Sequence, residues 1–222
     1  MARDRYVPAL RFRALTGLYD PLVRATTREG EFKSRLLDQA ALQAGERVLD
    51  LGCGTGTLAI QAKRARPEAS IVGLDGDPEV LERGRRKATA AGVLVEFDEG
   101  HSTELPYADS SFDVVLSTLF FHHLTGPDKR RTAAEVARVL KPGGRLHVAD
   151  WGRPADPAMR LLAVSIRLLD GFEQTRDNLA GNLPQVFEGA GLRDATEVGR
   201  LRTVFGTLAF FRASTPGGRE AG

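Results

Sequence analysis

The sequence lacks most features that mark secreted, metal-binding or membrane-spanning proteins. Its single cysteine, Cys53, cannot form an internal disulfide, which excludes a disulfide-stabilised secreted fold and weakens any thiolate metal site. The longest apolar stretch, around Val114 to Phe121, is far too short to cross a bilayer. No apolar run near the N-terminus suits a signal sequence. These absences predict a cytoplasmic protein without a membrane partner.

An excess of charge of one sign is also missing. The formal net charge is +2, and the arginines are scattered, with the densest local groups near the N-terminus and at residues 83–86. No basic stripe alternates with aromatic side chains, as it does in proteins that bind nucleic-acid strands, so no nucleic-acid partner is predicted. A length of 222 residues with 42% hydrophobic residues predicts one well-buried domain.

The most informative segment present is a glycine-rich turn, Asp50-Leu51-Gly52-Cys53-Gly54-Thr55-Gly56. A short apolar strand precedes it, and residues 57–65 have the pattern of a helix. Three alternating glycines let the main chain turn sharply and approach a ligand closely, while the first N–H groups of the helix can point at that ligand. Asp75 ends the next predicted strand, and a carboxylate about 20 residues after such a turn suits a ribose diol. The turn therefore predicts a nucleoside-containing cofactor.

The spacing of the glycines separates two classes of cofactor. Dinucleotide-binding enzymes use G-x-G-x-x-G, which would place the third glycine at position 57. In this chain the third glycine is Gly56, and Thr57 follows it. A nicotinamide-linked reductase, suggested by the turn and Asp75, is therefore an alternative rather than the first choice.

Four segments in order resemble the motifs of class I S-adenosylmethionine (SAM) methyltransferases of the small-molecule type. They are Val48 to Gly56, Ile71 to Asp75, the pair Leu105-Pro106-Tyr107 and Ser111 to Val115, and Leu140-Lys141-Pro142-Gly143-Gly144. They cover roughly residues 45 to 150, and Tyr19-Asp20 resembles a dipeptide of the quinone-biosynthesis group. The resemblance implies SAM as cofactor and in-line methyl transfer to a small, hydrophobic or aromatic molecule. A SAM-binding protein without turnover is a further alternative, because no general base is distinguished by its spacing.

The alternation of strand and helix patterns predicts an α/β fold, with a Rossmann-like doubly wound sheet. Strands are predicted at 47–51, 70–75, 93–97, 112–118 and 145–150, with helices at 57–65, 78–91 and 127–140. Two final strands, 193–198 and 203–211, resemble the antiparallel closing pair of the family. The predicted organisation is a helical cover at 1–44, a domain at 45–212 with a substrate-side helical insertion at 151–190, and a disordered tail at 213–222.

The resemblance assigns the cofactor site residue by residue. Gly52, Gly54 and Gly56 make room for the methionine half, Asp50 holds its amino group, and Asp75, with Gly76 beside it, takes the ribose hydroxyls. The backbone of Ser117 borders the methionine part. Many relatives have an acid and an alanine where this chain has His101 and Ser102. A neutral imidazole can accept one hydrogen bond from adenine and the N–H of Ser102 can donate one, but a solvent-facing His101 is equally open.

The acceptor side is less clearly marked. The acid-or-asparagine, two-proline and aromatic signature of enzymes that methylate base or glutamine amino groups is missing after residue 118, which disfavours that chemistry. His122 and His123 are candidate general bases, since imidazole titrates near neutrality, with a structural role as the alternative. Without a nearby carboxylate they make a poor metal site, so no metal is predicted.

An aromatic, apolar wall is predicted around a small-molecule methyl acceptor. The alternative for each aromatic is that it packs in the core. A homodimeric assembly is left open. The candidate substrate-binding residues are Tyr19, Phe121, Trp151, Asp170 and Phe172.

Overall fold

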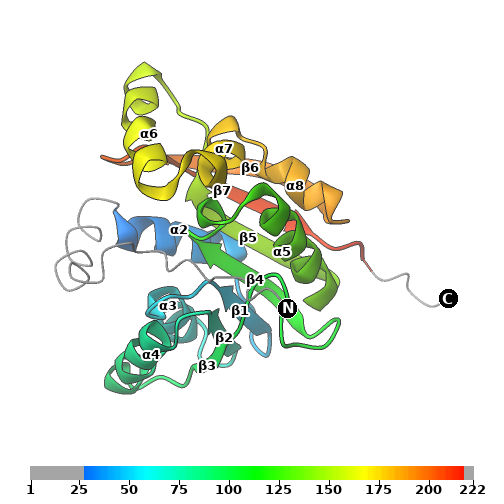
Figure 1. The fold of residues 1–222 in the computed structure, drawn as a ribbon. Helices are drawn as coiled ribbons and strands as arrows, with labels where there is room; N and C mark the ends of the chain where they lie inside the picture. The colour runs from blue at the N-terminus through cyan, green and yellow to red at the C-terminus, as the bar shows by residue number, and fades with distance from the viewer. Residues whose placement is uncertain (1–27, 218–222) are drawn as a thin grey trace, which may run out of the picture.

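The computed structural model describes residues 28–217, apart from the side chains of residues 165 and 167–170. Tyr19 and most of the predicted N-terminal cover lie outside the described residues. Seven strands form one sheet in the order β3-β2-β1-β4-β5-β7-β6 (Figure 1). The strands are β1 (Arg47–Leu51), β2 (Ser70–Asp75), β3 (Glu96–Glu99), β4 (Phe112–Thr118), β5 (Leu140–Trp151), β6 (Arg193–Arg202) and β7 (Thr207–Ser214).

Eight α-helical or 3₁₀ segments surround the sheet within the described residues. They are α2 (Glu29–Ala40), α3 (Thr57–Ala65), α4 (Pro78–Ala91), η1 (Phe121–His123), α5 (Gly126–Val139), α6 (Pro157–Asp170), α7 (Phe172–Ala180) and α8 (Leu183–Gly189). Strands β1 to β5 pair in parallel, whereas β7 pairs antiparallel with both β5 and β6. The predicted fold class, a mostly parallel doubly wound sheet with an antiparallel C-terminal pair, is confirmed.

The core lies on both faces of the sheet, because successive side chains of a strand point to opposite sides. Val48 of β1 packs in a cluster with residues of α2, α3 and α6. Leu49 and Leu51 of the same strand pack in a second cluster with residues of α5 and α8. Burial on both faces explains the nearly continuous apolar run of this short strand.

Most predicted boundaries in the first half agree with the structure. The helix at 78–91 begins after Asp77, whose side chain accepts a hydrogen bond from the Glu79 N–H, and ends at Gly92 in the left-handed conformation. That cap also explains why β3 begins later than predicted. The Val93 N–H still bonds to the Ala88 carbonyl, so β3 starts pairing only at Glu96 and not at the predicted residue 93.

The second half shows larger differences. The polar run after residue 170, which lies in the predicted helical insertion at 151–190 but had no helix bounds of its own, forms α7, with Thr175, Asn178 and Leu179 on one buried face. Strand β5 begins at Leu140, where the prediction began at 145. Strand β7 continues through Ser214, and the Thr215 hydroxyl donates to the Lys141 carbonyl at 2.6 Å, which orders residues assigned to the predicted tail.

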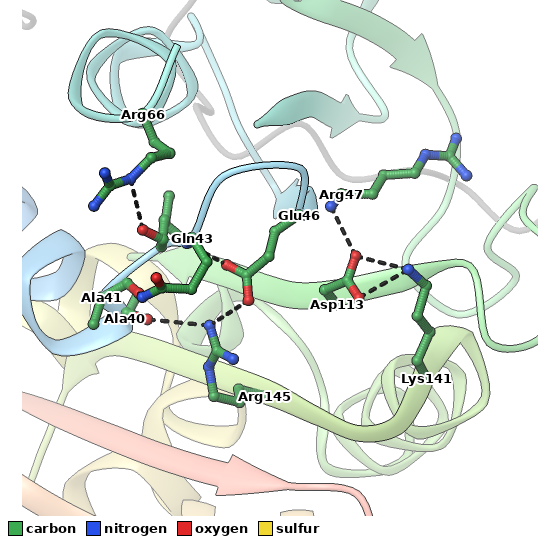
Figure 2. A network of polar contacts seen from close by, with 10 residues as sticks. Ala40, Ala41, Gln43, Glu46, Arg47, Arg66, Asp113, Lys141 and Arg145 are labelled. Atoms are coloured by element: carbon green, nitrogen blue, oxygen red, sulfur yellow. Dashed lines mark hydrogen bonds and ion pairs between the residues drawn. The ribbon is translucent and has the colours of Figure 1, made fainter. Parts of the chain in front are cut away.

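A polar network joins the amino ends of the central strands (Figure 2). Arg145 of β5 lies 2.8 Å from Glu46, which precedes β1. The Arg47 N–H donates to Asp113 of β4, and Lys141 donates to both oxygens of the same carboxylate. These partly exposed contacts hold the loop before β1 on the sheet and lie at the end opposite the carboxyl edge, so we assign them a structural role.

Candidate functional site

The candidate site lies at the carboxyl edge of the parallel strands, where an open α/β sheet binds ligands. The chain runs outward in one direction from β1 to β2 and β3, and in the other from β4 to β5. The ends of β1 and β4, which pair with each other, therefore form the point where strand order reverses. Gly52, Asp75, Phe120 and Asp150 all stand at or beside strand ends on this edge.

The Asp75 carboxylate accepts hydrogen bonds from the backbone of the glycine turn and of the segment after β2. Its Oδ2 accepts a hydrogen bond from the Gly54 N–H at 2.9 Å, and its Oδ1 accepts one from the Asp77 N–H at 3.1 Å. Burial raises the pKa of Asp75, and these backbone hydrogen bonds oppose the rise. The carboxylate predicted to bind ribose is thus placed beside the turn, as the sequence spacing indicates.

The three glycines of the turn have different surroundings, although all have positive φ. A Cβ at Gly52 would lie 2.3 Å from the Phe120 ring, and one at Gly56 would lie 2.6 Å from the Phe97 ring. A Cβ at Gly54 would meet no atom of the described residues within 4 Å. Gly52 and Gly56 are therefore required by protein packing, whereas the space beside Gly54 is open to a ligand.

Asp50 offers a buried oxygen that suits a cationic ligand group. The residue is 1% exposed, and its Oδ2 accepts a hydrogen bond from the Ala59 N–H at 3.1 Å. Its Oδ1 has no hydrogen-bond partner in the part of the chain that the structure describes. Burial raises the pKa of Asp50 to about 7, against the opposing effect of the Lys33 ammonium. A buried oxygen without a partner among the described residues, on the strand that leads into the glycine turn, fits the amino group of the implied cofactor.

The remaining predicted cofactor residues have mixed surroundings, and their roles stay predictions. His101 is exposed, and its backbone forms an isolated antiparallel β-bridge with Glu104. Ser102 is 9% exposed, with its hydroxyl 2.9 Å from that of Thr132. The Ser117 hydroxyl is fully buried and donates to the Leu51 carbonyl at 2.9 Å, joining β4 to the end of β1. Gly76 directly follows β2.

His122 forms a buried pair with Asp150, which lies 28 positions further along the chain. The His122 Nδ1 is 2.7 Å from the Asp150 Oδ1, and both side chains are at most 5% exposed. Asp150 also accepts backbone N–H bonds from Phe120, His122 and Trp151. Burial alone would raise the pKa of Asp150, but the His122 ring and these hydrogen bonds hold it below its ordinary value. The sequence-based view that no carboxylate lies near the histidines is wrong.

His123 differs from its neighbour. Its ring centroid lies 3.9 Å from that of His122. Burial lowers the pKa of His123 to about 3, and repulsion by the His122 ring contributes in the same direction. A group with so low a pKa is a weak proton acceptor at neutral pH, because an efficient base titrates near the working pH. Of the two predicted catalytic histidines, the structure therefore favours His122.

The predicted acceptor wall is only partly assembled. Trp151 is 6% exposed, and its ring centroid lies 6.2 Å from that of His122. Phe121 is fully buried and packs edge-on against Phe187 at 5.4 Å, so it belongs to the core instead of to a pocket wall. Phe172 is 62% exposed at the start of α7. The side chains of Tyr19 and Asp170 lie outside the described residues.

Two buried polar residues near the pair were not among the predicted site residues. Asn178 of α7 is fully buried, and neither its amide nitrogen nor its amide oxygen has a hydrogen-bond partner among the described residues. Lys129 of α5 is also fully buried and donates to the Gln174 carbonyl. Burial lowers the pKa of Lys129, while the carboxylates of Asp177 and Asp150 oppose this shift. The only sequence signal was the spacing of Thr175, Asn178 and Leu179, which fits a helix face.

Two features are absent from the residues and side chains that the structure describes. No group of three or more histidine, cysteine or acidic side chains is arranged to hold a metal ion there. Among the same residues, no helix combines the length and apolar character needed to cross a membrane.

Comparison with known proteins finds similarity in the central segment. Residues 48–144 match a family model described as a methyltransferase domain. The chain is 40% identical over 131 residues to a demethylmenaquinone methyltransferase of Thermus thermophilus, covering 59% of each protein. It is 39% identical over 139 residues to a 27-O-demethylrifamycin SV methyltransferase of Amycolatopsis mediterranei, covering 62% of this chain and 49% of that protein.

The fold agrees with a solved structure as well. A SAM-dependent methyltransferase from Aquifex aeolicus superposes with a TM-score of 0.63 at 20% identity, covering 82% of this chain and 88% of that one. At this identity the likeness concerns the fold. The chain matches between about half and three fifths of the length of the two curated relatives named above.

Proposed function

Because residues 48–144 match a family model described as a methyltransferase domain, we propose that this protein transfers a methyl group from SAM to a small, hydrophobic or aromatic molecule. One observation carries the proposal. The open glycine turn with Asp50 and the buried His122–Asp150 pair stand at the ends of neighbouring strands β1, β4 and β5. A cofactor-binding half and a proton-accepting half thus face the same edge of the sheet.

The cofactor-binding half would hold SAM by its polar ends. The Asp50 Oδ1 would accept the ammonium group, and Asp75 would bind the ribose hydroxyls. The open space beside Gly54 admits the ligand close to the backbone. The bound cofactor supplies a sulfonium-activated methyl group with a neutral thioether as leaving group. The protein therefore has to align the acceptor and exclude water, and such positioning is worth roughly 7–11 kcal/mol of the barrier.

His122 is the proton acceptor in this proposal when the acceptor atom is a hydroxyl oxygen. Its Nδ1–H donates to Asp150, which selects the tautomer with the lone pair on Nε2. As the acceptor oxygen gains the methyl group, its proton passes to the His122 Nε2. The Asp150 carboxylate, held ionised by its hydrogen bonds, then stabilises the imidazolium. Acceptors that carry no proton to lose would bypass this step.

The relatives indicate the class of acceptor. One is named for a demethylmenaquinone and the other for a demethylrifamycin. Both names support an acceptor with an extended apolar ring system. The buried Trp151 beside His122 supports the same class, because an indole ring offers an apolar face to a flat molecule.

The decisive experiment is transfer of a labelled methyl group from SAM into a metabolite extract of the source organism. We expect a labelled, organic-extractable product that disappears in Asp75→Ala, a variant that should lose cofactor binding. Tight binding of S-adenosylhomocysteine together with no transfer would instead favour a SAM-binding protein without turnover. Stabilisation by NADH but not by S-adenosylhomocysteine would support a reductase and contradict the proposal.

Two finer points belong to the same proposal. A cytoplasmic location is supported by the lack of a membrane-spanning helix in residues 28–217, and fractionation of cells tests it. A homodimer remains a prediction, and light scattering of the purified protein measures the assembly directly.

A further inference from the structure

A groove beside the site has a composition that neither the sequence motifs nor the comparisons explain. It lies between the segment after β5, helix α6 and helix α7, and has a volume of about 310 Å³. Two arginines and four apolar or nearly apolar residues line it: Arg153, Arg160, Pro154, Ala163, Val164 and Leu179. Its volume is in the range of small-molecule sites.

The positive charge of the groove is not neutralised locally. Among the residues whose side chains the structure describes, neither Arg153 nor Arg160 forms an ion pair. Asp156, which lies between the two arginines in sequence, is engaged elsewhere: its Oδ2 lies 3.1 Å from the Arg202 guanidinium, and its Oδ1 accepts the Met159 N–H. An arginine is always charged, and its planar fork matches a carboxylate. Both arginines are exposed, so the attraction acts partly through solvent and should weaken as salt is added.

The groove is close to the reacting centre. Arg153 follows Asp150 by three residues, so their Cα atoms are at most about 11 Å apart. Trp151 belongs to the same buried cluster as Ala163 and Leu179, which line the groove, and its other neighbour is the His122 ring at 6.2 Å. Trp151 thus shares a buried cluster with two residues of the groove and makes a ring contact with the proposed base.

We propose that this groove is the subsite for an acidic group of the methyl acceptor, and that the acceptor is an apolar or aromatic carboxylate. Arg153 and Arg160 bind the carboxylate, the apolar lining contacts the ring system, and the atom to be methylated points toward His122. The inference rests on the proposed function and adds to it that the methyl acceptor carries a negative charge.

The test compares a hydroxynaphthoic acid with its own carboxamide, two probes of nearly the same shape that differ in charge. Binding to the full chain saturated with S-adenosylhomocysteine is measured by calorimetry. We expect the acid to bind at least tenfold more tightly than the amide, and the preference to shrink as salt is added. In the double variant Arg153→Gln/Arg160→Gln, the two probes should bind alike.

The matched control is Arg83→Gln/Arg86→Gln, which removes two arginines from a separate hollow on α4 and should keep the preference. Equal binding of acid and amide to the unchanged protein, no binding of the acid, or an unchanged preference in the Arg153/Arg160 variant would each overturn the subsite. Failure of S-adenosylhomocysteine to bind at all would instead overturn the proposed function, so the two failures are distinguishable.

Discussion

The two sides of the carboxyl edge are built in different ways. On the β1–β2 side, the binding groups are backbone atoms and two carboxylates that lie within one strand–helix–strand unit, between Asp50 and Asp75. On the β4–β5 side, the groups are side chains from separate elements, with His122 meeting Asp150 across 28 positions. The first side depends on local backbone shape and the second on packing. Substitutions on the two sides should therefore impair the protein in different ways.

The largest effect should come from Gly54→Val on the cofactor side. The new side chain would fill the open space beside the turn, and we expect S-adenosylhomocysteine binding to become undetectable by calorimetry. The left-handed backbone, with φ of +53°, adds a strain of roughly 1–2 kcal/mol.

Gly92→Val is the matched control for that strain. Gly92 has a φ of +66°, and a Cβ there also meets nothing within 4 Å, but it caps α4 away from the site. The Gly92→Val variant should lose about as much stability in a thermal melt as Gly54→Val does, while keeping its affinity for S-adenosylhomocysteine. Equal losses of affinity in both variants would show that strain, and not the open space, governs binding.

On the acceptor side, His122→Gln should lower kcat by about 10²–10⁴, the usual contribution of a general base, with unchanged cofactor affinity. Glutamine keeps an N–H donor for Asp150, which limits the cost of leaving that buried carboxylate without a partner. His123→Gln should change kcat by less than tenfold, because the pKa of His123 is already about 3. Similar losses in both variants, measured in steady-state assays, would contradict a distinct role for His122.

A smaller effect should appear in the pH dependence of cofactor binding. With a pKa of about 7, Asp50 carries a proton below neutrality, whereas binding an ammonium group requires the carboxylate. The affinity for S-adenosylhomocysteine should therefore rise with pH between about 5.5 and 7, by up to tenfold per pH unit, and then level off. Asp50→Asn should bind weakly with a flat profile. A flat profile in the unchanged protein would show that Asp50 is ionised throughout.

The smallest effect should be a gain in stability on the acceptor side. Asn178 is buried without a hydrogen-bond partner among the described residues, so Asn178→Leu should raise the free energy of unfolding by about 1 kcal/mol. Thr175→Val, on the same helix and equally buried, removes the hydrogen bond to the Gly171 carbonyl and should lower it by about 1 kcal/mol. Urea unfolding measures both. A loss of stability in Asn178→Leu would mean that this amide already has a partner.

Much of the fold was predictable because its signals are local. The cap at Asp77, the left-handed Gly92 and the apolar strand before the glycine turn act on adjacent residues, and their elements appear where predicted. The bounds of helix α7, inside the predicted helical insertion, could not be predicted because its buried face contains Thr175 and Asn178, polar residues that gave no apolar period. Phe121 was assigned to a pocket because its sequence position cannot show which side of η1 faces the core.

The sequence by itself determined the glycine turn, the carboxylate one crossover later and the class of cofactor that they imply. Each depends on backbone conformations set by neighbouring residues. Only the tertiary structure decided which histidine is paired, that Asp150 is its partner, and that two arginines share a groove beside Trp151. These relations join segments far apart in the chain, and the packing of helices on the sheet brings them together.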